Sequence, residues 1–218
     1  MKMKKMLMMF FVLAFSSSIF AQSNGSFEEG LNDPGDYWIT VFGDNTTAIT
    51  NWTVSGHSVD YIGNYWQASD GVRSLDLSGI SAGAVSQTVE TIPGMTYQVT
   101  FDMSGNPDAG AGVKLMSVSA NGASSQTFQY ITGTNTRDDM QWASHIYYFT
   151  ATDSTTLLTF ASQIEGWFGP ALDNVSMELT TQICHLNSGK KGSKTLTIGA
   201  SAVASHLDHG EYVGPCAQ

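Results

Sequence analysis

The stretch VSQTVETIPGMTYQVTFDMSG, residues 85–105, decides the class of fold. Apolar and polar residues alternate over positions 97–103, and the apolar side consists of Tyr97, Val99, Phe101 and Met103. Such alternation predicts a half-buried β-strand. Pro93 and Gly94 favour a tight turn back to residues 85–89, and residues 74–78 repeat the alternation. Three such segments joined by glycine-rich turns predict an antiparallel sheet packed on a core.

The first 21 residues have the order of a secretory signal peptide. Lys2, Lys4 and Lys5 precede an apolar run over residues 6–15, and the segment ends at Ala21. This run is shorter than the roughly 20 residues that span a bilayer, and no later run reaches that length. We expect cleavage after Ala21 and a secreted protein, extracellular or at the cell surface, with no membrane span after cleavage.

The charge of the remaining chain is strongly acidic. Three of the 9 Lys and Arg residues lie in the leader, which leaves 6 against 19 Asp and Glu residues. Such a surface repels nucleic acid and anionic lipid, so neither is an expected partner. Carboxylates in an exported protein favour calcium as a cofactor, because calcium prefers hard oxygen ligands.

Several further segments have the length and alternation of strands. We expect strands at residues 37–42, 52–54, 113–120, 125–130, 143–150, 155–162 and 172–179, and a polar loop at residues 43–47. Eight to ten short strands with regular turns predict an all-β fold, a two-sheet antiparallel jelly-roll sandwich over residues 22–180. The composition changes at Thr180, so residues 181–218 are expected to form a small Cys/His element, with a short helical pattern near residues 200–207.

A series of motifs carries a family resemblance across residues 24–180. The motifs are NGSFE (24–28), VDYI and YWQASDG (within 59–71), SLDLSG (74–79), SGNP (104–107) and GPALDNV (169–175). They resemble the choice-of-anchor C family, which is similar to a domain of unknown function of plant cell-wall proteins. The resemblance implies a galactose-binding-like jelly roll and an extracellular, polysaccharide-associated role. Members of that family often end in a sorting or anchoring signal, whereas this chain ends in a Cys/His segment.

One carboxylate, Asp173, lies in an apolar strand. Counting with a period of two puts it on the same face as Val175, Met177 and Leu179. A buried carboxylate needs a cation or several hydrogen-bond donors. The resemblance implies a structural calcium between the start of the chain and the last strand, so we expect Glu28 and Asp173 to bind calcium. The alternative is that Asp173 forms a salt bridge with Arg73 or hydrogen bonds with a loop.

The aromatic residues divide into core and ligand-binding candidates. Trp52 and Trp66 lie in strand-like contexts, where we expect them to fill the sandwich. Trp167 and Phe168 lie between two glycines on a predicted loop, where apolar aromatics indicate a binding surface. The weaker candidates for the same ligand-binding platform are Tyr65 and Trp38.

The C-terminal element contains both cysteines and three of the five histidines. In an exported chain, Cys184 and Cys216 more often form a disulfide than a pair of thiolate ligands for zinc. His206 and His209 are three residues apart, so one helical turn would place them on the same face. Together with His185 they are possible zinc ligands, whether or not the cysteines are oxidised.

These observations favour a non-catalytic protein. No G-x-S-x-G or H-E-x-x-H motif occurs, and the carboxylates form no recognisable catalytic pair. We expect a secreted carbohydrate-binding or cell-wall and extracellular-matrix module whose partner is a polysaccharide or cell-surface glycan. The alternative is a structural or adhesive surface protein that acts through protein contacts, and a glycan-active hydrolase ranks below both.

Overall fold

The computed structural model describes residues 22–121, 123–186 and 192–216. The predicted signal peptide lies outside these residues. No helix within the described residues has the length and apolar character needed to cross a membrane.

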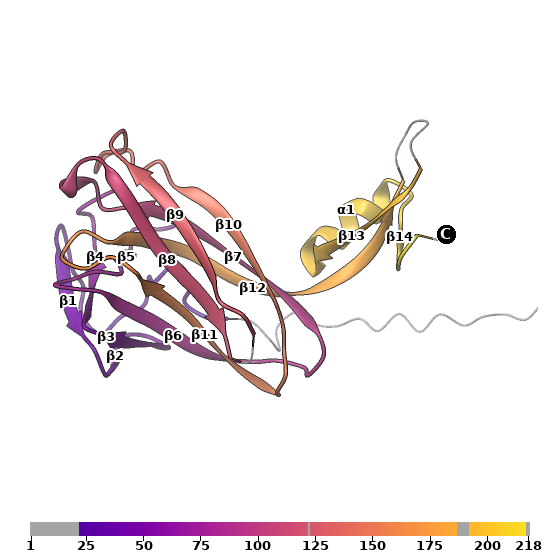
Figure 1. Ribbon diagram of the computed structural model, residues 1–218, viewed down its shortest axis with the longest axis horizontal. Helices are drawn as coiled ribbons and strands as arrows, with labels where there is room; N and C mark the ends of the chain where they lie inside the picture. Colours follow the sequence, from indigo (N-terminus) through magenta and orange to yellow (C-terminus); the bar gives the residue numbers. More distant parts are fainter. Residues whose placement is uncertain (1–21, 122, 187–191, 217–218) are drawn as a thin grey trace, which may run out of the picture.

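Two antiparallel sheets pack face to face (Figure 1). The first sheet has the order β2-β3-β6-β11-β8-β9, with bounds β2 (Asn45–Ile49), β3 (Trp52–Gly56), β6 (Gly83–Glu90), β11 (Thr155–Ser162), β8 (Gly112–Ala120) and β9 (Gln126–Thr132). The second has the order β1-β4-β5-β12-β7-β10, with bounds β1 (Trp38–Phe42), β4 (Ser58–Ile62), β5 (Ser74–Asp76), β12 (Pro170–His185), β7 (Thr96–Gly105) and β10 (Ala143–Thr150). The predicted two-sheet antiparallel sandwich is therefore confirmed.

The alternation in the sequence corresponds to this layering. Tyr97, Val99, Phe101 and Met103 of β7 all point into the space between the sheets and are buried. The Phe101 ring lies 5.3 Å from the Phe160 ring of the facing sheet, measured between centroids. Trp52 is also buried in this core, as predicted. Burial of such large apolar side chains is the main favourable term in folding.

Trp66 is buried elsewhere. It belongs to a smaller cluster with Ile62, Met140 and Ala171, which is separate from the main core. Ile62 and Ala171 point away from the facing sheet, because their strand neighbours Tyr61 and Leu172 belong to the main core. Trp66 therefore covers the outer face of the second sheet, and the prediction that it fills the sandwich is wrong.

Strand β2 occupies the position of the predicted polar loop at residues 43–47. Its sequence is NTTAI, and Ile49 is its one fully buried residue. The Asn45 side chain accepts hydrogen bonds from the backbone N–H groups of Thr47 and Ala48 at 3.0 and 2.8 Å. As an edge strand, β2 buries little apolar surface, and it therefore lacks the alternation by which the other strands were predicted.

A β-bulge in β12 changes the direction of Asp173. Leu172 pairs with Met103 and Met177 pairs with Val99, and all four side chains lie in the main core. Between these pairs the register shifts, and Asn174 has a φ of 49°. The extra residue reverses the alternation, so Asp173 points to the outer face of the sheet. The prediction that Asp173 shares the face of Val175, Met177 and Leu179 is wrong for this reason.

The last part of β12 leaves the sandwich, as Figure 1 shows. Residues up to Leu179 pair with β7, and residues from Thr180 to His185 pair with β13 (Lys194–Gly199). The change of partner thus falls at the change in composition. Three further elements complete this region: η2 (Ala200–Ala202), α1 (Val203–Asp208) and β14 (Tyr212–Val213). A disulfide joins Cys184 to Cys216, with Cα atoms 4.7 Å apart, which confirms the predicted pairing.

Candidate ligand-binding groove

A groove of about 370 Å³ lies on the outer face of the second sheet. Its walls come from β1, β4 and four loops. The residues that line it are Trp38, Thr40, Asp60, Ile62, Tyr65, Trp66, Gly79, Ile80, Asn106, Asp108, Trp167 and Phe168. The four aromatic residues that the sequence singled out as binding candidates therefore lie around one groove. The polar residues were not predicted from the sequence, although Asp60 lies within the motif VDYI and Asn106 within SGNP.

The aromatic walls remain accessible to solvent. Trp167 is 65% exposed, Trp38 is 43% exposed and Phe168 is 36% exposed. Trp38 packs edge-on against Tyr65, with ring centroids 4.7 Å apart and planes at 64°. Aromatic side chains at such exposure lose apolar hydration when a ligand covers them.

Tyr65 is fixed by contacts on two sides. Its hydroxyl donates a hydrogen bond of 2.8 Å to Asp108, and the Arg137 guanidinium lies 4.1 Å from the centre of its ring. Arg137 also donates to Asp108 at 2.9 Å. These contacts hold the ring before any ligand arrives, so less conformational entropy is lost on binding.

A buried carboxylate, Asp60, contributes to the groove. The Thr40 hydroxyl donates to its Oδ1 atom at 2.6 Å. Burial raises the pKa of the Asp60 carboxyl, and the hydrogen bond from Thr40 opposes this rise. A carboxylate in an aromatic groove can accept hydrogen bonds from ligand hydroxyl groups.

Asp76 lies below the groove and is fully buried. Its carboxylate accepts hydrogen bonds from Asn106 Nδ2 at 2.8 Å, from the Ser78 N–H at 2.8 Å and from the Gly169 N–H at 3.0 Å. Burial raises the pKa of Asp76 to about 7, although these donors oppose the rise. Asp76 therefore connects a groove residue, Asn106, to the loop that carries the two aromatics before Gly169.

Lys114 of β8 also holds this loop. Its side chain is buried, and its Nζ atom donates a hydrogen bond of 2.5 Å to the carbonyl oxygen of Phe168. Burial lowers the pKa of Lys114, and the neighbouring charge of Asp76 opposes this effect. The backbone beneath Trp167 and Phe168 is thus fixed from both sheets, while the side chains remain exposed.

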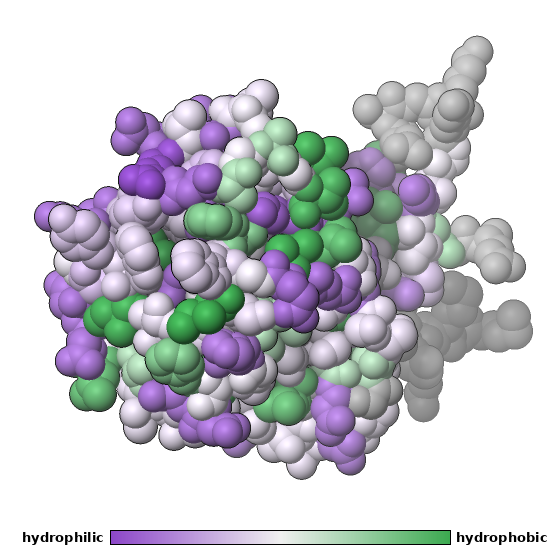
Figure 2. All heavy atoms as spheres, turned by 60° about the vertical axis from the view of Figure 1, so that its left-hand side comes forward, coloured by the Kyte–Doolittle hydropathy of each residue, from purple (hydrophilic) through white to green (hydrophobic). Residues whose placement is uncertain are grey.

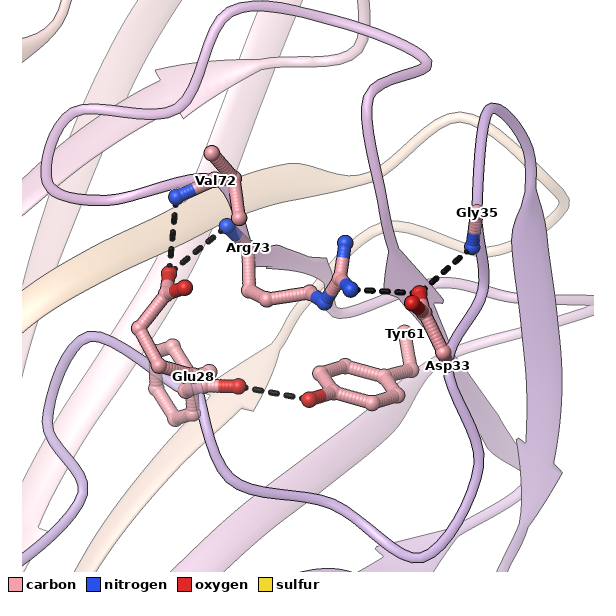
Figure 3. Close-up of polar contacts among 7 residues, drawn as sticks. Glu28, Asp33, Gly35, Tyr61, Val72 and Arg73 are labelled. Carbon is pink, nitrogen blue, oxygen red and sulfur yellow. Dashed lines mark hydrogen bonds and ion pairs between the residues drawn. The ribbon is translucent and has the colours of Figure 1, made fainter.

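Glu28 and Asp173 contact residues 69–73, the last part of the loop that carries Tyr65 and Trp66. Glu28 Oε1 accepts hydrogen bonds from the N–H groups of Val72 and Arg73 at 2.9 and 2.8 Å (Figure 3). Asp173 accepts from the N–H groups of Ser69 and Asp70 at 2.7 and 2.9 Å. These donors favour the alternative of hydrogen bonds to a loop. Calcium binding by the two carboxylates stays a prediction.

Arg73 does not pair with Asp173. Its guanidinium forms an ion pair with Asp33, and Asp33 also accepts a hydrogen bond of 2.8 Å from the Gly35 N–H (Figure 3). Burial raises the pKa of Asp173 to about 7, against the backbone donors that lower it. The salt bridge that the sequence allowed as an alternative is therefore absent.

The histidines of the C-terminal element have different surroundings from those expected. His185 and His206 converge on Glu211, and these three side chains offer ligand atoms within 4.8 Å of one another. Among the described residues they form the one group of this kind, and His209 is not part of it. Glu211 was not among the predicted ligands, although it immediately follows the motif H-x-x-H-G at residues 206–210.

The chain as a whole forms a two-sheet antiparallel sandwich, with an aromatic groove on the outer face of one sheet and a C-terminal element that contains a disulfide. The chain belongs to the family described as "Protein of unknown function (DUF642)", which matches residues 21–178. Halomucin from Haloquadratum walsbyi (strain DSM 16790 / HBSQ001) is 34% identical over 179 residues. That match covers 76% of this chain and 2% of halomucin, so the chain spans a small fraction of this relative.

Several solved structures share likeness with the chain at low sequence identity. TmCBM61 in complex with beta-1,4-galactotriose has a TM-score of 0.43 and 20% identity, and the match covers 72% of this chain and 97% of that one. CBM35 from Cellvibrio japonicus Abf62 has a TM-score of 0.44 and 13% identity, with 64% and 91% covered. At these values the likeness assigns no ligand to this chain.

Proposed function

We propose that this protein is a secreted, non-catalytic carbohydrate-binding module that holds a polysaccharide or cell-surface glycan in the aromatic groove. The observation that carries the proposal is the position of Trp38, Tyr65, Trp167 and Phe168 around one cavity that also contains Asp60. The proposal includes membership of the choice-of-anchor C group, which the motifs of the sequence support.

The chemistry of the groove suits a sugar. The C–H faces of a pyranose ring can pack against exposed aromatic rings, while its hydroxyl groups need hydrogen-bond partners. Asp60 and Asn106 supply such partners beside the aromatic walls. An apolar cavity with a few fixed polar groups is the usual form of a small-ligand site.

The carboxylates of the groove support a binding role over hydrolysis. A typical glycoside hydrolase places two carboxyl groups on either side of the scissile bond, one as acid and one as base or nucleophile. Here Asp108 already accepts from Tyr65 and Arg137, and Asp60 accepts from Thr40. Both oxygens of Asp108 are committed to protein contacts, whereas Thr40 occupies only one oxygen of Asp60. The groove therefore offers one acceptor carboxylate, Asp60, which suits recognition better than an acid–base pair.

Figure 2 also bears on the alternative of protein contacts. On the face turned forward, the apolar side chains, in green, form several separate patches among hydrophilic residues. A stable protein interface usually has a contiguous, well-packed core. This face therefore gives less support to adhesion through protein than the groove gives to sugar binding.

The test is glycan binding by the mature protein and three variants. An array identifies a ligand, and calorimetry then measures its affinity for wild type, Trp38→Ala, Trp167→Ala and Phe42→Ala. Phe42 is the matched control, because it lies on β1 on the same face as Trp38, is 55% exposed and does not line the groove.

We expect each tryptophan variant to bind at least about tenfold more weakly, since loss of a central aromatic contact typically costs more than 1 kcal/mol. Phe42→Ala should bind like wild type. Equal affinity of all four proteins would refute the groove as the binding site, and an array without any bound glycan would refute the function.

A further inference from the structure

Three segments of the C-terminal element bring His185, His206 and Glu211 together. In the antiparallel pairing of β12 with β14, Cys184 lies opposite Tyr212. The next position along each strand places His185 opposite Glu211. Helix α1 supplies His206 from the third segment.

The C-terminal end of α1 turns the chain back so that Glu211 lies next to His206. The N–H of Gly210 donates to Leu207 O at 2.9 Å, and the N–H of Glu211 donates to His206 O at 3.3 Å. This pair of bonds is a Schellman motif. It requires a left-handed residue after the helix, and Gly210 has a φ of 82°. The position of Glu211 is thus set by backbone geometry.

The side chains of both histidines contact the carboxylate of Glu211. His185 Nδ1 lies 2.6 Å from Glu211 Oε1, and His206 Nδ1 lies 2.5 Å from Oε2. The two imidazole rings are 5.9 Å apart and nearly perpendicular, at 83°. The nitrogens of two rings therefore meet the two oxygens of one carboxylate.

Hydrogen bonding explains only part of this arrangement, because His206 Nδ1 forms a hydrogen bond with Glu211 Oε2 and His185 Nδ1 does not. His185 Nδ1 is buried, yet it forms no hydrogen bond of acceptable geometry with any described residue. The Glu211 side chain is also buried, in a region where Ile183 and Cys184 are the buried apolar residues after Leu179. A carboxylate in so small a core requires a strong partner. A buried imidazole nitrogen without a hydrogen bond, beside a carboxylate shared with a second imidazole, favours an ion held between these ligand atoms.

We propose that His185, His206 and Glu211 bind one zinc ion. Two imidazoles and a carboxylate are a zinc ligand set, with metal–ligand bonds of about 2.0–2.2 Å. Tetrahedral ligand atoms at these bond lengths lie about 3.4 Å apart, so small rotations of the side chains accommodate the ion. The set differs from the one that the sequence indicated, because Glu211 takes the place of His209.

The ion would have a structural effect. It links the end of β12 to the helix and to the segment before β14, while the disulfide from Cys184 to Cys216 links the same strand to residues further on. Small elements with little apolar core are commonly stabilised by such cross-links. The zinc site shares no residue with the groove, so the zinc proposal can be tested independently of sugar binding.

The experiment is calorimetric titration of the metal-free mature protein with zinc chloride. The variants are His206→Ala, Glu211→Gln and the control His209→Ala, which removes a histidine from the same turn. Thiol titration with Ellman's reagent and the melting temperature verify that each variant keeps the disulfide and the folded sandwich. Cobalt substitution provides a second readout, because tetrahedral cobalt has strong visible absorption.

We expect one zinc per wild-type chain, with affinity reduced at least roughly 100-fold in His206→Ala and Glu211→Gln. The control should bind as wild type does. Absence of saturable zinc binding by wild type would overturn the proposal. An equal loss in His209→Ala would overturn this ligand set, as would unchanged binding in both site variants.

Discussion

Asp76 makes the pH dependence of stability a sharp test of the structure. Its carboxylate is fully buried beneath the groove and receives donors from Ser78, Asn106 and Gly169. Replacement by asparagine keeps the shape of the side chain and removes its titration. The charged groups that act on Asp76 are Asp60, from β4, and Lys114, from β8.

The magnitude follows from the raised pKa. Burial moves the pKa of Asp76 from 3.8 to about 7. Below pH 3.8 the carboxyl is protonated in both the folded and the unfolded chain. Between 3.8 and 7 only the folded chain retains the proton, so the free energy of unfolding falls as pH rises. At about 1.4 kcal/mol per pKa unit, the loss is about 4 kcal/mol and is complete above pH 7.

Asp76→Asn should lack this loss. One of the three donors would face the new amide N–H₂ group, which cannot accept, so at pH 4 the variant should be less stable than wild type by about 1–3 kcal/mol. At pH 8 it should equal or exceed wild type. Asp173, whose pKa is also about 7 because of burial, keeps its own contribution in the variant. The pH slope should therefore decrease without disappearing.

The assay is urea denaturation at several pH values from 4 to 8. Asp44→Asn is the control, because it makes the same replacement at an exposed position. If Asp76→Asn and wild type lose the same free energy between pH 4 and 8, the reasoning is refuted, since Asp76 would then be ionised throughout that range.

Three further predictions concern the rest of the chain. The double variant Cys184→Ser, Cys216→Ser should lower the stability of the C-terminal element by about 3–4 kcal/mol, because the disulfide joins residues 32 apart. Hydrogen exchange in β13 measures this loss, and unchanged exchange would contradict it. Gly210→Ala should cost about 1–2 kcal/mol in the same measurement, because its φ is positive, and an unchanged value would exclude strain there. The calcium prediction for Glu28 and Asp173 requires a higher melting temperature in calcium than in EDTA, and equal temperatures would refute it.

Strands with a buried face could be predicted from the sequence, and those without one could not. The ranges predicted for β10 and β11 agree with the structure, and the more buried residues occupy every second position over most of each strand. Edge strand β2 buries one large residue and was missed. The direction of Asp173 was missed because a bulge changes the alternation, and no local residue pattern distinguishes a bulge from a continuous strand.

The candidate groove could be predicted only in part. The position of Trp167 and Phe168 between two glycines identified the loop that carries them. Their proximity to Trp38 depends on pairing between strands that are distant in the sequence, which residue spacing does not report. Glu211 illustrates the same limit, since its partner His185 lies across a strand pair whose register was not predictable.

The outer face of the second sheet shows how this architecture positions a site. Strand residues that point away from the core are usually exposed to solvent. Here several of them are buried acids that accept hydrogen bonds from the loops. Asp76 holds the Gly169 N–H, and Asp173 holds the N–H groups of residues 69 and 70. Asp102 accepts from the Ser69 hydroxyl at 2.5 Å. Each loop is thus fixed through its backbone or a short side chain, and the aromatic side chains of Tyr65 and Trp167 remain available to a ligand. Substitutions at the acids should therefore weaken binding of the proposed ligand without touching it.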